Sequence, residues 1–497
     1  MNFSQFKKNS IHNILGWIIP IIIFIILTPI MIKKMGQEAF GIITIIQIIT
    51  GYMTVLNFGF SEAIIKQVAE SFGKDKEQTM RVLWVGMGIF FIVGSFGTGI
   101  LFLLSGWLGM EVLQVPEELR LDTVKAIQIG SIAFLLQMMA EFYRGASLGC
   151  HRFDIPNISR IVRISLSGLF IVLVLEKGMG IVEVMIASVT GLAIGLVINV
   201  IWMHKILPMN RVHGGHRKVA RTLFHFSKHI FFVRLAGIVS NKIGQFFLGT
   251  LSSIANVALY EVPTRAAEAG STMLGRVLQV FYPGISAMDK VKEKNKIKEI
   301  LLSVLSIQMF ISIPIMIMVV LEGATILSIW IDPDFAEKSA EIIMLVAITY
   351  LLSSLTNLPG LLAMSFDIPS IISKYSVIRI IITAIIVYPF VKWFGLIGAA
   401  WVLLLSELPG IPFIHETVYR IFGIKIYRLF ARKISVHIIS ALILYVIYEY
   451  GFRNTEFYTP YAVLLIGVLH AVISLVFKTT TSEDNRRMMK VITVWKS

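Results

Sequence analysis

The chain of 497 residues contains a single cysteine, Cys150, and few charged residues. One thiol cannot form a disulfide within the chain, so such a cross-link is excluded. Charged residues make up 15% of the sequence, against roughly 25% in soluble domains. Hydrophobic residues make up 56%, and the mean hydropathy is +0.79. This balance excludes a soluble globular domain and indicates a protein whose main solvent is lipid.

Long apolar runs recur along the whole chain, and a helix of about 20 such residues spans a bilayer. The first run is too long for the apolar region of a secretory signal, and no small-residue cleavage site follows it, so we expect an uncleaved first span. The loops between runs are short and leave no room for a separate soluble domain. We predict an all-α polytopic membrane protein of about 14 transmembrane helices, at 11–32, 40–60, 82–107, 123–148, 157–175, 180–203, 228–250, 257–285, 301–321, 340–363, 371–391, 394–415, 432–450 and 458–477.

The net charge of +15 follows from the distribution of Lys and Arg among the loops. Alternate loops hold about 33 of the 45 Lys and Arg residues, whereas the loops on the other side hold about 8 and are acidic. Because cytoplasmic loops of membrane proteins are enriched in Lys and Arg, both termini are predicted to be cytoplasmic. Binding to anionic lipid headgroups accounts for the basic segments, and nucleic acid is not needed as a partner.

Four cations remain inside the predicted spans 228–250 and 257–285: Arg234, Lys242, Arg265 and Arg276. Four cations facing lipid would cost on the order of 10 kcal/mol, so they must face protein or water. A hydrated cationic cavity would suit phosphate, because arginine offers a planar fork and lysine a compact charge. The alternative is a purely structural network of ion pairs.

Polar residues recur every three or four positions in span 257–285, including Glu261, Arg265 and Glu268. Glu261 and Glu268 have the spacing to neutralise Arg265 within the helix. Span 228–250 carries Asn241 and Gln245 on a similar face, and span 40–60 carries Gln47 and Asn57. Amides facing cations would fit a ligand that is part sugar and part phosphate. Polar stripes also join helices to one another, so both interpretations stay open.

The tetrapeptide Phe-Asp-Ile-Pro occurs twice, at 153–156 and 366–369. Each copy follows an acidic outer loop and a long span, and precedes a basic patch, another span and a glycine turn at Gly180 or Gly395. The helices therefore form two six-helix lobes related by an internal parallel repeat, with two C-terminal helices added. The predicted parts are an N-lobe at 1–204, a cytoplasmic basic linker at 205–227, a C-lobe at 228–420, and the last two helices with a cytoplasmic tail at 421–497.

The tetrapeptides themselves have a structural interpretation. Asp154 and Asp367 can cap the helices that follow, with Pro156 and Pro369 in the first turn, where no amide hydrogen is missed. The alternative is a hinge or gate at the cytoplasmic mouth.

Motifs of metal or cofactor chemistry are lacking. His225 and His229 have a metal-like spacing, but no carboxylate occurs between Glu183 and Glu261. There is no phosphate-binding loop and no nucleophile, histidine and acid in a recognisable order. We expect no metal and no cofactor.

Three short motifs carry a resemblance to a known family: Gly36-Gln-Glu-Ala-Phe-Gly41, Asn57-Phe-Gly-Phe-Ser61 and Tyr143-Arg144-Gly145. They resemble the polysaccharide biosynthesis and O-antigen flippase family, within the superfamily of multidrug, oligosaccharidyl-lipid and polysaccharide exporters. The resemblance implies two six-helix lobes in a V, and movement of an undecaprenyl-diphosphate-linked oligosaccharide to the outer leaflet. Inward-facing arginines and lysines that meet the diphosphate are typical of such proteins, which would be Arg234, Lys242, Arg265 and Arg276 here.

The function expected from the sequence is therefore that of a flippase that works by alternating access, not an enzyme. Glu261, Glu268 and Glu407 are the candidate sites for a coupling sodium ion or proton, or else structural partners. The alternatives are a multidrug or small-metabolite exporter on the same scaffold, a membrane glycan polymerase or acyltransferase, and a non-transporting member of a glycan-assembly complex. The expected partners are a lipid-linked oligosaccharide, the bilayer of a bacterial or archaeal plasma membrane, and glycan polymerase or assembly proteins.

Overall fold

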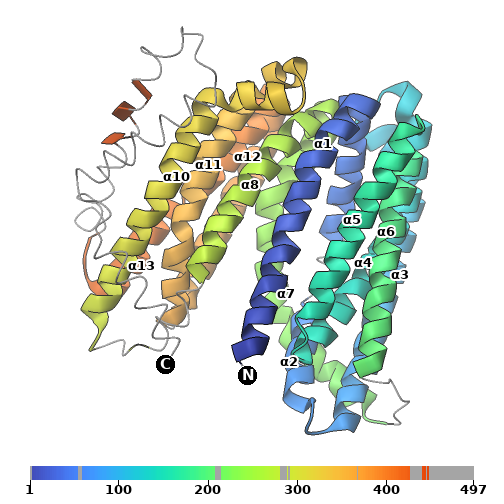
Figure 1. The fold of residues 1–497 in the computed structure, drawn as a ribbon, viewed down its shortest axis with the longest axis vertical. Helices are drawn as coiled ribbons and strands as arrows, with labels where there is room; N and C mark the ends of the chain where they lie inside the picture. Colours follow the sequence, from blue (N-terminus) through green and yellow to red (C-terminus); the bar gives the residue numbers. More distant parts are fainter. Residues whose placement is uncertain are drawn as a thin grey trace. The chain divides into compact units, whose positions relative to one another are not determined.

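The computed structural model is helical throughout the part of the chain that it describes (Figure 1). The described residues are 3–53, 57, 59–206, 214–279, 288, 292–366, 368–425 and part of 439–446. The chain divides into two compact units, unit 1 at 1–258 and unit 2 at 259–497. The predicted helices at 432–450 and 458–477 lie almost wholly outside the described residues, and the predicted lobe boundaries stay a prediction.

Unit 1 is a bundle in which α3 packs on α4, α4 on α6, and α5 on both α6 and α1. Its core contains the large buried side chains Phe90, Phe134 and Phe142. The helices are α1 (Phe3–Met53), α2 (Phe60–Ser71), α3 (Lys76–Trp107), a short π-helix (Leu108–Val112), α4 (Glu117–Gly149), α5 (Asp154–Glu176), α6 (Ile181–Ile206) and α7 (His216–Leu251).

Helix α1 is two helical arms that meet at Gly36. A straight helix of its length would measure about 75 Å, more than twice the bilayer core. Gly36 interrupts it with φ +84° and ψ 166°, a conformation that L side chains rarely adopt. This glycine falls in the predicted loop between spans 11–32 and 40–60.

Unit 2 contains most of α8, followed by helices in which α10 packs on α11, and α11 on α12 and α13. A core of leucine, isoleucine, valine and phenylalanine side chains joins α10, α11 and α13. The helices are α8 (Ile254–Gln279), α10 (Lys294–Trp330), α11 (Pro333–Ser365), α12 (Pro369–Glu407) and α13 (Gly410–Phe422).

Helix α12 folds back on itself at Gly395, where φ is +54° and ψ −125°. A Cβ atom on Gly398 would overlap the carbonyl oxygen of Phe390, whereas residues eight apart in a straight helix lie about 12 Å apart. The expected glycine turn at Gly395 is therefore confirmed. The corresponding turn of unit 1 covers 177–180 and so includes the expected Gly180, and its positive φ belongs to Gly178.

The protein is a multi-pass membrane protein. Among the described residues, 8 helices are long and apolar enough to cross a membrane, and two of them contain the turns at Gly36 and Gly395. Helix α3 exposes the large apolar side chains Ile92, Phe96 and Leu103, as a lipid-facing helix does. The count of about 14 helices stays a prediction.

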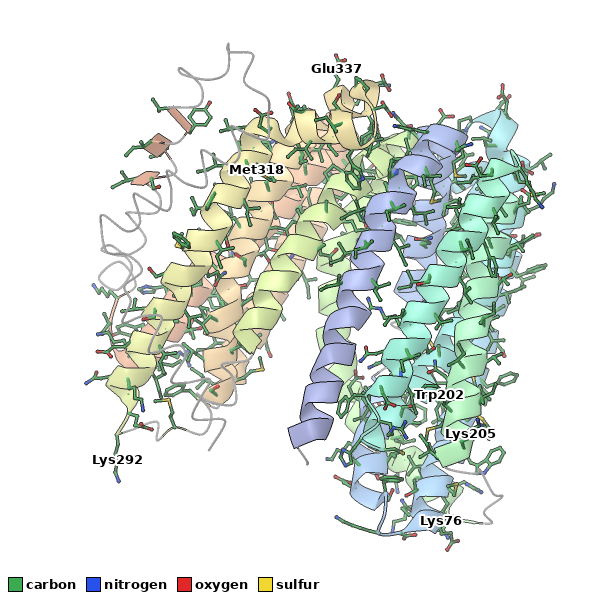
Figure 2. The ribbon with its side chains drawn as sticks, viewed as in Figure 1. Lys76, Trp202, Lys205, Lys292, Met318 and Glu337 are labelled. Carbon is green, nitrogen blue, oxygen red and sulfur yellow. The ribbon has the colours of Figure 1, made fainter. Side chains whose placement is uncertain are left out.

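Charged residues lie at the ends of each unit as the loop pattern predicts (Figure 2). Within unit 1, Lys76 and Lys205 lie at one end, close to Trp202. Within unit 2, Lys292 lies at one end, and Glu337 of a predicted outer loop lies at the opposite end. In unit 2, a residue of a predicted cytoplasmic segment and one of a predicted outer loop therefore lie at opposite ends.

The two tetrapeptides both mark the starts of helices. Pro156 lies in the first turn of α5, and Pro369 is the first residue of α12, as predicted. The Asp154 carboxylate accepts hydrogen bonds from Arg152 Nε at 2.8 Å and Nη2 at 2.7 Å. Asp367 lies outside the described residues.

Candidate functional site

The predicted polar stripe on α8 begins with a buried carboxylate and an exposed arginine. Glu261 is buried, and its Oε1 lies 3.9 Å from Arg265 Nη1, one turn further along the helix. The Arg265 side chain is 50% exposed. The predicted pair therefore exists as a long contact, and the guanidinium stays accessible.

The other three predicted cations are placed only in part. Lys242 is half-buried on α7. Arg234 and Asn241 lie on α7 and Arg276 lies on α8, but their side chains are outside those that the structure describes. A chamber lined by all four cations stays a prediction.

The three predicted carboxylates gather around one side chain of unit 2. The electrostatic neighbours of Tyr350, on α11, include Glu268 and Glu261 of α8 and Glu407 of α12. Glu268 is half-buried, and Glu261 and Glu407 are buried. The structure thus brings together, in one region, acids that are far apart in sequence.

The predicted sugar-facing amides differ in their surroundings. Gln47 is exposed on the second arm of α1, and Gln245 is fully buried on α7. Asn57 is buried, and its Oδ1 accepts the Gly59 amide hydrogen at 2.9 Å, in a turn where Gly59 has φ +78°. Asn57 therefore holds a backbone turn, and a role toward sugar stays a prediction for all of them.

Two of the short motifs meet in unit 1. Arg144 Nη2 lies 2.6 Å from Glu141 Oε2 and donates to Ser61 Oγ at 3.1 Å. A Cβ atom on Gly145 would lie 3.1 Å from the Ser61 carbonyl oxygen. Tyr143-Arg144-Gly145 of α4 and Asn57–Ser61 before and within α2 thus form one contact, which explains their residue types structurally.

The loop pattern missed one intramembrane cation. The loop charge count assigns Arg379 to a cytoplasmic basic patch although the predicted span 371–391 contains it, and it lies about 15 Å along α12 from Pro369. Its Nη2 lies 2.5 Å from Oε1 of Glu407 on the other arm of α12. Ser353 of α11 also hydrogen-bonds Glu407. The apolar residues that flank Arg379, from Val377 to Ile382, are the signal that could have identified it.

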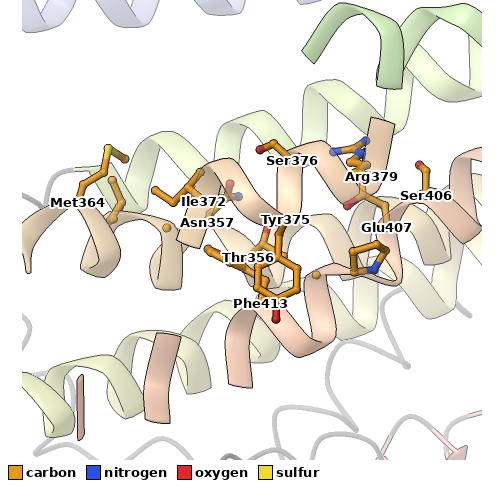
Figure 3. Close-up of a pocket in the computed structure, with 14 residues that line it drawn as sticks. Thr356, Asn357, Met364, Ile372, Tyr375, Ser376, Arg379, Ser406, Glu407 and Phe413 are labelled. Carbon is orange, nitrogen blue, oxygen red and sulfur yellow. Dashed lines mark ion pairs between the residues drawn. The ribbon is translucent and has the colours of Figure 1, made fainter. Parts of the chain in front are cut away.

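This ion pair forms one end of a cavity of about 320 Å³ within unit 2 (Figure 3). The cavity lies between the end of α11, both arms of α12 and the start of α13. The side chains of Met364, Ile372 and Phe413 supply apolar surface. Its polar lining includes Thr356, Asn357, Ser376, Arg379, Ser406 and Glu407.

A second network lies beside this cavity, nearer the start of α12. Glu416 of α13 accepts from Lys374 Nζ at 2.7 Å and from the Tyr375 hydroxyl at 2.8 Å, and it pairs with Arg420 at 2.7 Å. The network joins α12 to α13 and fixes the position of the Tyr375 ring at the cavity wall.

Metal-binding groups are lacking among the described residues: no cluster of three histidine, cysteine, aspartate or glutamate side chains could hold an ion there. His225 and His229 lie where side chains are not described. The chemistry of the described sites is that of hydrogen bonding and ion pairing.

The sequence of this chain is similar to those of known proteins. Residues 6–289 match the family model described as "Polysaccharide biosynthesis protein". A putative O-antigen transporter of Shigella flexneri is 22% identical over 400 residues, covering 79% of this chain and 93% of that protein. A probable flippase of Haloferax volcanii, AglR, is 22% identical over 408 residues, covering 82% of this chain and 80% of that protein.

Two solved structures share the fold. A lipid II flippase, MurJ, in an inward closed conformation superposes with a TM-score of 0.70 at 14% identity, covering 95% of this chain and 98% of that chain. An inward-facing multidrug resistance transporter of the MATE family superposes with a TM-score of 0.71 at 12% identity, covering 82% of this chain and 98% of that chain. Identities this low show the fold alone.

Proposed function

Because the chain belongs to the polysaccharide biosynthesis protein family, we propose that it moves a lipid-linked oligosaccharide across a membrane. The family comprises transporters and flippases, not enzymes. In finer terms, we infer a flippase that carries an undecaprenyl-diphosphate-linked oligosaccharide, such as an O-antigen repeat unit, from the inner to the outer leaflet.

The observation that carries this proposal is the extent of the likeness. Relatives named as an O-antigen transporter and as a flippase match this chain over about four-fifths of its length. The match extends over both units and is not confined to a single segment. A common activity of the whole protein is therefore a better explanation than a shared structural element.

The physical problem that such a protein solves is the cost of moving a charged sugar headgroup through hydrocarbon. Unaided transfer of buried polar and ionised groups is prohibitive, so a hydrated protein path removes the main barrier. In our proposal Arg234, Lys242, Arg265 and Arg276 bind the diphosphate. The exposure of half of the Arg265 side chain supports this role, because solvent reaches it.

The proposed cycle is alternating access between two lobes. The headgroup enters a cationic cavity from the cytoplasm, the lobes rock, and the headgroup leaves outward while the lipid tail stays in the bilayer. Glu261, Glu268 and Glu407 are the proposed sites of a coupling sodium ion or proton, and their shared neighbour Tyr350 supports a common role for them. We place the protein in the plasma membrane of a bacterium or archaeon, beside glycan polymerase or assembly proteins.

The direct test is a scramblase-type assay with purified protein. Proteoliposomes hold an undecaprenyl-diphosphate-linked oligosaccharide in both leaflets, and a membrane-impermeant glycosidase removes the glycans that it can reach. Without protein, about half of the lipid stays protected. We expect the protein to make the protected half accessible, at a rate that falls in an Arg276→Ala variant.

A multidrug exporter or a non-transporting assembly protein would leave the protected half intact. A glycan polymerase would lengthen the oligosaccharide in the same vesicles, which mass spectrometry of the extracted lipid detects. Either result would overturn the proposed function.

A further inference from the structure

The cavity in unit 2 lies at a break in a helix. The sequence predicts one span at 394–415, but α12 ends at Glu407 and α13 begins at Gly410. Pro409, which has no amide hydrogen, and Gly410 both line the cavity. Irregular backbone at membrane depth is tolerated where it is buried in protein or lines a hydrated space, and interrupted helices in transporters often contact ligands.

The cavity wall carries no net charge. Its two charged side chains, Arg379 and Glu407, lie 2.5 Å apart and neutralise each other. While this pair is closed, a phosphate group would be repelled by the carboxylate, and a cation by the guanidinium. The cavity therefore suits a neutral ligand, unlike the predicted cationic chamber on α7 and α8.

The rest of the wall is divided between apolar and hydrogen-bonding surfaces. The rings of Tyr375 and Phe413 lie with centroids 5.7 Å apart and an interplanar angle of 66°. The Asn357 amide and the Ser376 hydroxyl also line the cavity, and within the described residues neither makes a hydrogen bond. An amide offers two donors and an acceptor, and a hydroxyl offers one donor and two lone pairs.

The surfaces have the pattern that a sugar ring requires. A pyranose has apolar C–H faces, which pack on aromatic rings, and a rim of hydroxyl groups, which amides and hydroxyls bind. Figure 3 shows Asn357, Ser376 and the aromatic pair around one space, with the Arg379–Glu407 pair at its end. The volume of about 320 Å³ falls at the lower end of the range of small-ligand sites.

We propose that this cavity is a subsite for one neutral sugar unit of a lipid-linked glycan. The proposal rests on the proposed function. It adds to the diphosphate site a second site, which binds the glycan. Asn357 and Ser376 bind sugar hydroxyls, and Tyr375 and Phe413 pack against a C–H face of the ring.

Gly360 allows the cavity to be filled without strain. Gly360 lines the cavity, and a Cβ atom there would meet nothing within 4 Å, so Gly360→Leu can place its side chain in the space. Gly99 of α3 is the matched control, because it is also helical, is exposed, meets nothing within 4 Å and belongs to unit 1, whereas the cavity is lined by unit 2. Both variants receive the same side chain.

The test measures binding to the full-length protein in lipid nanodiscs. The probes are undecaprenyl-diphosphate-linked N-acetylglucosamine and unglycosylated undecaprenyl diphosphate. We expect Gly360→Leu to weaken binding of the glycosylated probe about tenfold or more, equivalent to about 1.4 kcal/mol, and to leave the unglycosylated probe unchanged. Gly99→Leu should change neither, and Asn357→Ala should reproduce the selective loss with a smaller side chain.

The remaining outcomes overturn the subsite. If wild type binds the glycosylated probe and Gly360→Leu binds it equally well, the cavity is only a water-filled space and the proposed flippase function is unaffected. If Gly360→Leu weakens both probes equally, the variant disturbs the carrier site or the fold. If wild type binds neither probe, the proposed function fails together with the subsite.

Discussion

The guanidinium of Arg379 and the carboxylate of Glu407 lie 2.5 Å apart, although they occupy opposite arms of α12. A straight helix would separate them by about 40 Å. The pair closes the hairpin whose turn is Gly395, and it is largely screened from solvent, with side chains 24% and 7% exposed. The pair therefore contributes both to the stability of the hairpin and to the shape of the adjoining cavity.

Removing one partner of this pair should destabilise the protein strongly. Glu407→Leu leaves the guanidinium of Arg379 in a largely buried site without its carboxylate, which costs about 3 kcal/mol. The double variant Arg379→Met with Glu407→Leu removes both charges and should recover most of that loss. Thermal unfolding of the detergent-solubilised full-length protein measures the effect.

The control is an exposed pair on α11. Lys338 lies 2.7 Å from Asp334, with both side chains more than half exposed. Lys338→Ala should cost less than about 1 kcal/mol, because solvent screens exposed ion pairs. Equal losses from the two single variants would contradict a special role for the buried pair.

The hairpin turn should tolerate no side chain at Gly398. Gly398→Ala would drive its Cβ into the carbonyl oxygen of Phe390, a backbone atom that cannot move without opening the turn. We expect lower expression and a melting temperature several degrees lower. At Gly99, where a Cβ meets open space, alanine should instead be neutral or stabilising by up to about 1 kcal/mol. Similar melting temperatures for the two variants would argue against a tight turn.

Hydropathy and loop charge predicted much of this architecture, because both are set by the bilayer. The turn at Gly36 falls between the predicted spans 11–32 and 40–60, and the turn at Gly395 falls at the start of the predicted span 394–415. The break before Gly410 was missed because a hydropathy window averages over Pro409-Gly410, although that dipeptide is itself a turn signal.

The site was less predictable from sequence, because pairing across helices depends on tertiary structure. The charge count assigned Arg379 to a cytoplasmic basic patch, although the predicted span 371–391 contains it, and α12 places it well inside a helix that is long and apolar enough to cross a membrane. Glu407 was predicted as a coupling-ion site or a structural partner, but its partner Arg379 on the other arm could not be predicted. The Asn57 side chain also accepts a hydrogen bond in a local turn, which is common for asparagine and could not be read from the helical spacing, and its role toward sugar stays a prediction.

The single thiol should be unreactive in the folded protein. Cys150 is buried between α4 and α5, and this burial raises the pKa of its thiol to about 12. Because the thiolate is the nucleophile, N-ethylmaleimide at pH 7.5 should not modify it in the native state, but should do so after denaturation in detergent. Mass spectrometry of the intact protein measures the modification.

An engineered surface thiol provides the control for this experiment. Ser370 is exposed near the start of α12, so a Ser370→Cys variant should be modified once in the native state. Rapid native modification of Cys150 itself would contradict its burial. If the prediction holds, the wild-type chain serves as a background for site-specific labelling without removal of its cysteine.

The exposed arginine of α8 gives the sharpest test of diphosphate binding. Arg265→Ala should weaken binding of undecaprenyl diphosphate about tenfold to a hundredfold in nanodiscs, because charge-assisted hydrogen bonds contribute about 1.5–3 kcal/mol. Arg265→Lys keeps the charge but loses the planar fork, so its affinity should lie between those of wild type and alanine. Lys392→Gln, at an exposed site on α12, is the control and should not weaken binding. Unchanged affinity in Arg265→Ala would remove this residue from the proposed diphosphate site.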